Sequence, residues 1–205
     1  MFAVIPAAGR SRRMGQPKLL LSLGGRTVIA RLAEALRHPT IRETVVVLRR
    51  EDEPLRAAVV ECGATPLQPE RDPPDMRQSV QHALDSIRER YQPAADAGWL
   101  LIPADHPLLS RQALERLLSE WEASAAEILV PTYQGRRGHP TLFRWRFAEE
   151  VPAIPPDQGL NWLVRRHAAE IVEVPVDDPS VIADLDTPAD YAAALQRLKE
   201  SDPRP

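Results

Sequence analysis

The sequence predicts a doubly wound α/β fold, in which helices cover both faces of a mainly parallel sheet. Two observations predict it. Short apolar segments bounded by glycine- or proline-containing loops are typical of buried strands, and they alternate with segments whose apolar residues have helical spacing. With 205 residues and 43% hydrophobic content, the chain has enough apolar surface for one full core. We therefore expect a single domain over residues 1–200, followed by an unstructured tail at 201–205.

The elements follow a β-loop-α-β order from the N-terminus. The apolar run at residues 3–5 predicts the first strand, a loop extends from it to about Pro17, and helical spacing begins at Thr27. Buried strands are then expected at residues 44–48 and 99–102, a short strand at 64–67 and a further strand at 128–131. Helices are expected at residues 55–62, 76–91 and 111–121. Residues 132–150 break the rhythm and predict a hairpin-like insertion. The last expected elements are a strand at 171–176, a short apolar run at 181–182 and a helix from Pro188 to about Lys199.

This order predicts a Rossmann-like sandwich. In such sheets, ligands bind in the crevice beyond the carboxyl ends of the strands. Functional residues are therefore expected in the loops that follow Ile5, Leu48, Ile102 and Val130.

Composition and charge exclude several classes of protein. The formal net charge of −3 argues against a general nucleic-acid-binding protein. No run of 18 apolar residues could cross a membrane and the N-terminus does not resemble a secretory signal, so we expect a soluble cytoplasmic protein. The single cysteine, Cys62, excludes an internal disulfide and a cysteine-rich zinc site.

The charges are unevenly distributed along the chain. The first acidic residue is Glu34, and several arginines and one lysine precede it. Residues 168–196 carry acidic side chains with neither lysine nor arginine. One end of the chain is therefore suited to an anion and the other to a cation.

The loop after the first strand, residues 6–18 (PAAGRSRRMGQPK), has the composition of an anion-binding loop. Small residues at 7–9 allow backbone N–H groups to approach a polyphosphate, Gly15 permits a positive-φ turn, and Arg13 and Lys18 can neutralise phosphate oxygens. The loop lacks the GxxxxGK[ST] and GxGxxG patterns, which excludes a P-loop and a dinucleotide-binding loop. The alternative is a solvated basic loop.

This loop resembles the AAGxSxRMGxxK signature of nucleotidyltransferases with the MobA-like NTP transferase fold, and most closely that of molybdenum cofactor cytidylyltransferases. The wider group includes methylerythritol phosphate cytidylyltransferase and the sugar-nucleotide pyrophosphorylases. The resemblance implies a nucleotide-diphospho-sugar transferase-like fold. It also implies roles for the loop residues: nucleotide binding by Ala7, Ala8, Gly9 and Arg10, and triphosphate binding by Arg13 and Lys18.

The segment 103–107 (PADHP) follows the predicted strand at 99–102. A carboxylate at this place faces the ligand crevice, so Asp105 is suited to bind Mg²⁺ through an oxygen. The family has a GDxP or ADxP element here, whose Asp is a metal ligand. An Asp after a strand can instead cap the next helix, but Ser110 is the better cap for the helix that follows.

A second acidic element, residues 184–190 (DLDTPAD), resembles the family's DIDTPED. Thr187, Pro188 and Asp190 are explained by helix initiation alone. Asp184 and Asp186 are two apart and would share one face of an extended chain. The resemblance implies that one of them is the second metal ligand; we expect Asp184, with Asp186 orienting Asp184 or its water.

The segment 135–140 (GRRGHP) resembles the RGHP or RGNP element of the cofactor-transferring branch. Its two glycines and its proline predict a tight turn, and this turn would present two guanidinium groups and an imidazole. The resemblance implies that Arg136, Arg137, Gly138 and His139 contact the second, non-nucleotide substrate. The alternative is a hairpin turn with a solvated basic tip.

A further candidate is Ser79, in the first turn of the helix predicted at 76–91, where relatives read GMxxSL. Its hydroxyl could donate to the nucleobase or ribose, next to the free N–H groups of the helix N-terminus. Asp75 stands where the family has Gly. It can cap the helix, but it puts close approach of the backbone to the base in doubt.

Together these residues predict a Mg²⁺-dependent nucleotidyltransferase. A phosphate of the acceptor would attack the α-phosphorus of an NTP and release pyrophosphate. The resemblance implies molybdopterin or molybdenum cofactor as acceptor and a molybdoenzyme or chaperone as protein partner. We expect CTP rather than GTP, because the methyl groups of Ala7 and Ala8 narrow the space above the base. Two alternatives stay open: a sugar or polyol phosphate as acceptor, and a regulatory module that binds nucleotide without turnover.

Overall fold

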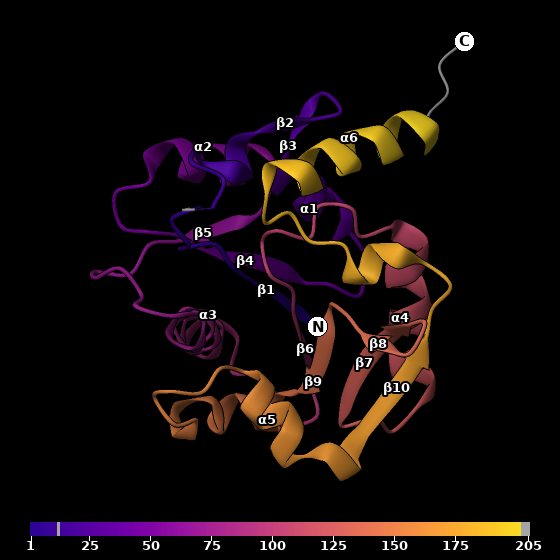
Figure 1. Cartoon of the computed structure of the whole chain (residues 1–205). Coiled ribbons are helices and arrows are strands. Elements are labelled where there is room, and N and C mark those ends of the chain that lie inside the picture. The colour runs from indigo at the N-terminus through magenta and orange to yellow at the C-terminus, as the bar shows by residue number, and fades with distance from the viewer. Residues whose placement is uncertain (12, 202–205) are drawn as a thin grey trace.

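The computed structural model describes residues 1–11 and 13–201, without the side chain of Ser201. Its centre is a mixed sheet in the order β10-β7-β9-β6-β1-β4-β5, with β8 paired to β7 (Figure 1). The strands are β1 (Phe2–Pro6), β4 (Glu43–Val47), β5 (Thr65–Leu67), β6 (Gly98–Leu101), β7 (Ile128–Tyr133), β8 (Arg136–Arg137), β9 (Thr141–Arg144) and β10 (Ile171–Pro175). A separate ribbon joins β2 (Ser22–Leu23) and β3 (Arg26–Thr27). The pairs β1–β4, β1–β6, β4–β5 and β7–β10 are parallel, which confirms the mainly parallel sheet.

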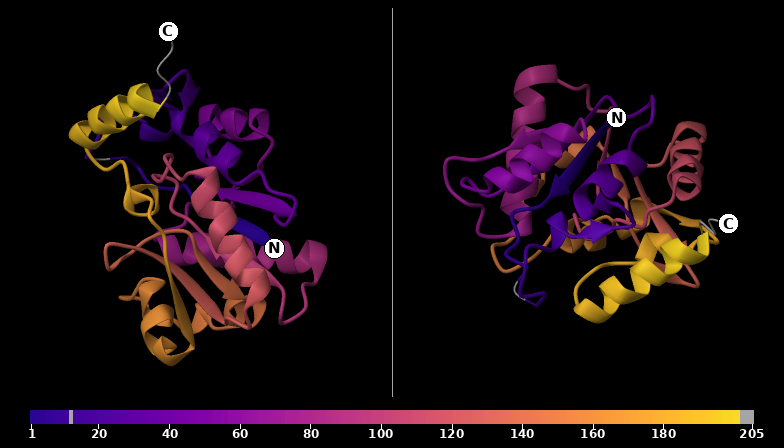
Figure 2. Two further views of the ribbon diagram at one scale, coloured as in Figure 1. Left: turned by 90° about the vertical axis from the view of Figure 1, so that its right-hand side faces the viewer. Right: turned by 90° about the horizontal axis from the view of Figure 1, so that it is seen from above.

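Helices cover both faces of the sheet, as predicted (Figure 2). The α-helices are α1 (Val28–Ala35), α2 (Glu53–Glu61), α3 (Met76–Tyr91), α4 (Arg111–Ala123), α5 (Asn161–Arg166) and α6 (Pro188–Ser201). The 3-10 helices are η1 (Lys18–Leu20), η2 (Trp145–Glu149), η3 (Val151–Ala153), η4 (Ala168–Glu170) and η5 (Pro179–Ile182). Among the described residues, none of these helices has the length and apolar content needed to cross a membrane.

The core is divided in two by the sheet. In β1, Ala3 and Ile5 belong to the apolar cluster under α1, α2 and α4, whereas Phe2 and Val4 belong to the cluster under α3, η2 and α5. This alternation is expected for a strand covered on both faces, because successive side chains point to opposite sides. It explains why the strand sequences are continuously apolar.

The helices begin where their capping residues predict. Ser110 accepts the N–H of Ala113 at 3.0 Å and begins α4. Thr187 and Asp190 form a reciprocal capping box at the start of α6, with Thr187 N to Asp190 Oδ2 at 2.7 Å and Asp190 N to Thr187 Oγ1 at 3.2 Å. The cap predicted at Asp75 is also present, since its Oδ1 accepts the N–H of Gln78 at 2.7 Å.

The predicted insertion at 132–150 contains a hairpin, but its second part joins the main sheet. Residues Thr132 and Tyr133 pair with the two residues of β8 around a turn with positive φ at Gln134 and Gly135. After it, β9 enters between β6 and β7 and runs antiparallel to both. The apolar run at 181–182 lies in η5. Of the predicted tail, Ser201 ends α6, and residues 202–205 lie outside the described residues.

His167 bonds two acidic side chains next to the apolar cluster under α3, η2 and α5. Its Nε2 lies 2.9 Å from Glu150 Oε2 and its Nδ1 lies 2.6 Å from Glu170 Oε1, and the ring meets Phe147 edge-on. Partial burial opposes protonation of the ring, but the hydrogen bonds to Glu150 and Glu170 outweigh it and raise the pKa of His167.

This raised pKa predicts a pH dependence of stability. The pKa of His167 is higher in the folded protein than in the unfolded chain. The imidazolium therefore adds its full contribution to the free energy of unfolding below the unfolded pKa of about 6.5, and this contribution disappears as pH rises through the folded pKa. We expect the free energy of unfolding, measured in urea, to fall more steeply above about pH 6.5 in the wild type than in His167→Gln. His82→Gln, on an exposed position of α3, is the matched control. Equal pH profiles for wild type and His167→Gln would contradict the assignment.

Candidate active site

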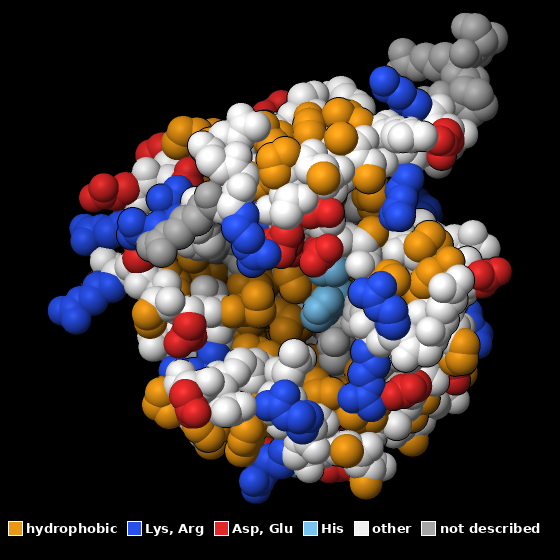
Figure 3. All heavy atoms as spheres, in the orientation of Figure 1, with side chains coloured by type: hydrophobic (Ala, Val, Ile, Leu, Met, Phe, Trp, Pro, Cys, Tyr) orange, Lys and Arg blue, Asp and Glu red, His pale blue; other side chains and the backbone are white. Residues whose placement is uncertain are grey.

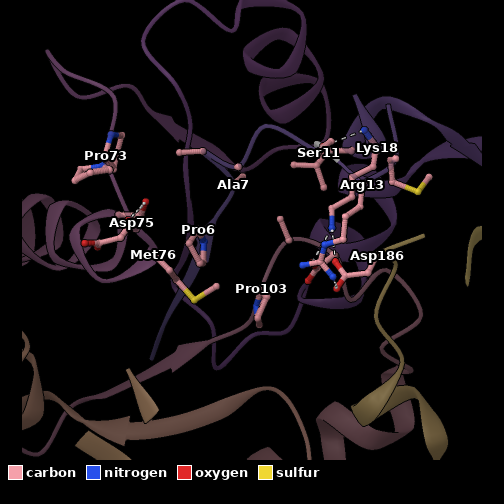
Figure 4. A pocket seen from close by; sticks show the side chains of 18 residues that line it. Pro6, Ala7, Ser11, Arg13, Lys18, Pro73, Asp75, Met76, Pro103 and Asp186 are labelled. Carbon is pink, nitrogen blue, oxygen red and sulfur yellow. Dashed lines mark hydrogen bonds and ion pairs between the residues drawn. The ribbon is translucent and has the colours of Figure 1, made fainter. Parts of the chain in front are cut away.

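A cleft of about 440 Å³ opens at the carboxyl ends of β1 and β6, where the fold predicts the ligand crevice (Figure 3). Three loops and one acidic residue form it: the loop after β1, the loop before α3, the loop after β6, and Asp186. Figure 4 shows two distinct sides. Pro73, Asp75 and Met76 lie on one, and Arg13, Lys18 and Asp186 lie on the other.

The loop after β1 lines the cleft with Ala7, Ala8 and Gly9, three of the residues expected to bind the nucleotide. The N–H of Ala7 is already used, since it donates to Val47 O at 2.8 Å. A nucleotide contact of Ala7 therefore has to use its methyl group or its carbonyl oxygen. Gly15 has a φ of +65° and so adopts the turn expected of it.

Lys18 lies at the centre of a charged cluster. Its Nζ donates to Asp105 Oδ2 at 2.8 Å, to the carbonyl oxygen of Leu185 at 2.8 Å and to Asp186 Oδ1 at 3.2 Å. Arg13 Nη1 donates to Asp186 Oδ2 at 2.6 Å (Figure 4). The structure thus brings together residues predicted separately as triphosphate and metal ligands. We call Arg13, Lys18, Asp105 and Asp186 the Lys18 cluster.

Of the two acidic candidates near the C-terminus, the structure places Asp186 beside Asp105. Asp186 lines the cleft, whereas Asp184 is exposed and is not among the lining residues. The backbone explains the difference. Leu185 N donates to Asp105 O at 2.9 Å, and Asp186 N donates to Asp190 Oδ2 of the capping box at 3.1 Å. These two bonds hold Asp186 against the loop after β6.

Two histidines lie edge-to-face next to the Lys18 cluster. The rings of His106 and His139 have centroids 4.9 Å apart, and His106 Nε2 lies 3.9 Å from Asp105 Oδ1. Histidine side chains are visible in the hollow beside acidic ones (Figure 3). Burial lowers the pKa of His106, and it lowers the pKa of His139 to about 4, so His139 is neutral at physiological pH. His139 was predicted to contact the acceptor; His106 was missed, although its position directly after Asp105 was a signal.

The remaining residues of the GRRGHP segment differ in their surroundings. Gly138 packs so closely on η5 that a Cβ atom would lie 2.2 Å from Val181 O, and His139 N donates to the same oxygen at 2.7 Å. Arg136 and Arg137 are exposed, and neither is among the described residues that line the cleft. Arg137 Nε donates to Glu173 Oε1 at 2.8 Å. The two arginines thus lie on a solvated hairpin, and the glycine and histidine lie near the site.

The side of the cleft opposite the Lys18 cluster combines the apolar Pro73, Pro74 and Met76 with Asp75 and Ser79. Met76 is 46% exposed and points into the cleft between Pro6 and Pro103 (Figure 4). Ser79 lines the cleft, but its hydroxyl already donates to Asp75 O at 3.1 Å, so it can offer a nucleotide only its oxygen lone pairs. This surface is suited to the flat face of a base or ribose.

Arg10 is not among the described residues that line this cleft, although a nucleotide contact was predicted for it. It pairs with Asp72 at 3.7 Å and lines a separate cavity behind the loop, together with Arg49 and Leu55. No signal in the local sequence indicated the pairing with Asp72, because the two residues are distant along the chain.

The carboxylates of the Lys18 cluster fit a divalent cation that arrives with a triphosphate. Oxygens of Asp105 and Asp186 converge on the single point held by Lys18 Nζ, and Mg²⁺ is typically bound by one or two carboxylates plus phosphate oxygens and water. Within the part of the chain that the structure describes, no group of three or more His, Cys, Asp or Glu side chains could hold a metal. Substrate phosphates would therefore have to complete the coordination.

Comparison with known proteins agrees with this geometry. The profile of the MobA-like NTP transferase domain matches residues 3–171. The molybdenum cofactor guanylyltransferase of Rhizobium meliloti (strain 1021) is 30% identical over 180 residues, which cover 85% of this chain and 78% of that protein. The 2-C-methyl-D-erythritol 4-phosphate cytidylyltransferase of Pseudomonas entomophila (strain L48) is 36% identical over 124 residues, 58% of this chain and 51% of that protein.

Solved structures show the same architecture. Rv0371c from Mycobacterium tuberculosis H37Rv superposes with a TM-score of 0.79 at 29% identity, covering 95% of this chain and 97% of that one. Its complex with manganese superposes with a TM-score of 0.76 at 28% identity, over 95% of this chain and 97% of that one. That homologue therefore binds a divalent metal.

Proposed function

The chain belongs to the MobA-like NTP transferase family and is a nucleotidyltransferase of the EC 2.7.7 type, and from this premise we propose that it transfers cytidine monophosphate from CTP to a molybdopterin-type phosphate acceptor. The observation that carries the proposal is the Lys18 cluster, which places two cations and two carboxylates at one end of the cleft. The acceptor is supported by the relative that acts on molybdenum cofactor and by the resemblance of residues 137–140 to RGHP.

The reaction forms a bond between an acceptor phosphate oxygen and the α-phosphorus, and it breaks the bond from the α-phosphorus to the bridging oxygen of pyrophosphate. The nucleophile needs no general base, because a phosphate is ionised at pH 7. Lys18 and Arg13 would neutralise the charge that develops on the leaving pyrophosphate. Mg²⁺ held by Asp105 and Asp186 would supply further charge neutralisation at the phosphates.

We assign acceptor binding to His139, with His106 next to it; both lie beside the Lys18 cluster, and neither is among the described residues that line the cleft. Both imidazoles have a buried Nδ1 without a hydrogen-bond partner among the described residues. Buried polar atoms are normally hydrogen-bonded, so the pair has hydrogen-bonding capacity that no described residue uses, at atoms that are closed off from the cleft surface. A sugar or polyol phosphate is the second candidate acceptor, supported by the match to a methylerythritol phosphate cytidylyltransferase.

Pyrophosphate release tests the proposal. The protein is incubated with Mg²⁺, CTP and either molybdopterin-type cofactor or a panel of sugar and polyol phosphates. We expect release with the cofactor. Release only with a sugar or polyol phosphate would overturn the acceptor assignment, and nucleotide binding without release from any acceptor would favour the non-catalytic alternative.

The choice of nucleotide is a separate prediction. Ala7 and Ala8 line the cleft. A base that binds beside them would have less space because of their methyl groups, so we expect single-turnover rates to be higher with CTP than with GTP and the preference to shrink in Ala8→Gly. Ala57→Gly, on an exposed position of α2, is the matched control. Preference of the wild type for GTP, the base named in the guanylyltransferase relative, would refute this steric argument. Unchanged preference in Ala8→Gly would show that selection lies elsewhere, for example at Ser79.

A further inference from the structure

We propose that Lys18 is an internal counter-cation: in the free protein its ammonium group occupies the position of the metal ion, and it leaves that position only when metal and triphosphate arrive together. The inference rests on the proposed function in one respect, namely that the Lys18 cluster receives a metal–triphosphate complex. It adds a coupling between the two ligands that the family's reaction does not require.

The hydrogen bonding of Lys18 is complete. An ammonium group has three donors, and the structure gives it three oxygen acceptors: Asp105 Oδ2, the carbonyl oxygen of Leu185 and Asp186 Oδ1, at 2.8, 2.8 and 3.2 Å. The side chain is only 15% exposed. If Lys18 served only to bind phosphate, its free ammonium group would be expected to extend into the cleft. Instead, the ammonium group is bound to the oxygens that would suit a metal ion.

The cluster is also balanced in charge. Asp105 and Asp186 carry two negative charges, and Lys18 and Arg13 carry two positive ones. Both oxygens of Asp186 are used, Oδ1 by Lys18 and Oδ2 by Arg13. A divalent ion that arrives alone therefore finds the acidic side chains already neutralised, and it has to displace an ammonium group that then has no anion to bind.

A metal–triphosphate complex removes this obstacle. The carboxylates can turn to the metal while Lys18 and Arg13 turn to the phosphates, so every charge keeps a partner. Lysine is suited to the exchange, because its ammonium is a compact charge on a flexible stem. A triphosphate without metal is also disfavoured, because drawing Lys18 away leaves two carboxylates beside the phosphates. Metal and triphosphate therefore strengthen each other's binding, and by linkage the coupling is the same in both directions.

The test measures Mn²⁺ binding to the full chain without nucleotide, from the electron paramagnetic resonance signal of free Mn²⁺. Lys18→Met removes the ammonium and keeps an apolar stem of similar length. We expect Lys18→Met to bind Mn²⁺ at least about tenfold more tightly than the wild type, because Asp105 Oδ2 and Asp186 Oδ1 become available to the ion. Lys199→Met, at an exposed position near the end of α6, is the matched control and should leave Mn²⁺ affinity unchanged. The double variant Lys18→Met/Asp105→Asn should lose the gain.

Folding of the variants is checked by circular dichroism and thermal melting, and Lys18→Gln provides a second neutral replacement if Lys18→Met does not fold. Mn²⁺ affinity in the folded neutral variant that is equal to or weaker than that of the wild type would overturn the proposal. The measurement needs neither acceptor nor turnover, so it separates two failures. Tighter Mn²⁺ binding without nucleotidyl transfer would count only against the proposed function. Transfer by the wild type without tighter Mn²⁺ binding in the variant would count only against the internal counter-cation.

Discussion

Asp105→Asn is expected to lower the rate of nucleotidyl transfer at least about a hundredfold, which corresponds to roughly 2.7 kcal/mol of transition-state stabilisation. An amide has the shape of the carboxylate but not its charge toward a divalent cation. The fold should be retained, because the structural bond at this position is made by the main chain: the carbonyl oxygen of Asp105 accepts the N–H of Leu185 at 2.9 Å. Pyrophosphate release at saturating Mg²⁺ and acceptor measures the effect.

The two acidic residues near α6 provide the comparison. Asp186→Asn should lose more activity than Asp184→Asn, because Asp186 contacts Lys18 and Arg13 while Asp184 is exposed. If Asp184→Asn were as impaired as Asp105→Asn, the expectation from the sequence would hold and Asp184 would be the second metal ligand. Near-normal pyrophosphate release by Asp105→Asn would show that the metal assignment itself is wrong.

Lys18→Ala is expected to lower kcat/KM at least about tenfold, equivalent to roughly 1.4 kcal/mol. The loss should appear mainly in kcat, because negative charge develops on the leaving pyrophosphate in the transition state, whereas ground-state affinity for the nucleotide should fall less. Steady-state kinetics together with calorimetric nucleotide binding separate the two effects, and Lys199→Ala is the matched control.

Two results would change this interpretation of Lys18. Equal loss of binding and of turnover would reduce Lys18 to a docking cation. If Lys18→Ala lost neither nucleotide affinity nor turnover, residues 6–18 would be interpreted as a solvated basic loop.

Local patterns in the sequence predict most of the fold. The strands and helices follow from apolar runs and helical spacing, and the capping residues Ser110 and Thr187 mark helix starts that the structure confirms. The place of β9 could not be predicted in this way. It depends on contacts between distant segments, such as the stacking of Phe143 on Trp99 with ring centroids 4.5 Å apart, and on the register that inserts β9 between β6 and β7.

For the site too, local sequence patterns identify candidate residues, but they do not predict contacts between residues that are distant along the chain. Residue types and their positions after strands identify Lys18 and Asp105 as candidates. The contact between Lys18 and Asp186 could not be predicted from the sequence, because it joins residues separated by 168 positions. Arg10 is a similar case: its type and position favour a nucleotide contact, but its ion pair with Asp72 depends on how the loop before α3 folds back.

The Lys18 cluster joins residues that are synthesised at opposite ends of the chain. All strands of the sheet are complete once residue 175 has been synthesised, but the apolar cluster under α1, α2 and α4 then still lacks its buried members Val181, Leu185 and Ala194. Leu185 and Asp186, which hold Lys18 and Arg13, leave the ribosome only afterwards. A nascent chain, or one cut short before residue 186, can therefore contain the whole sheet and still lack one of the two carboxylates. The segment from Val181 to Ala194 thus completes this apolar cluster and the Lys18 cluster together, and it closes a site that the loop after β1 begins.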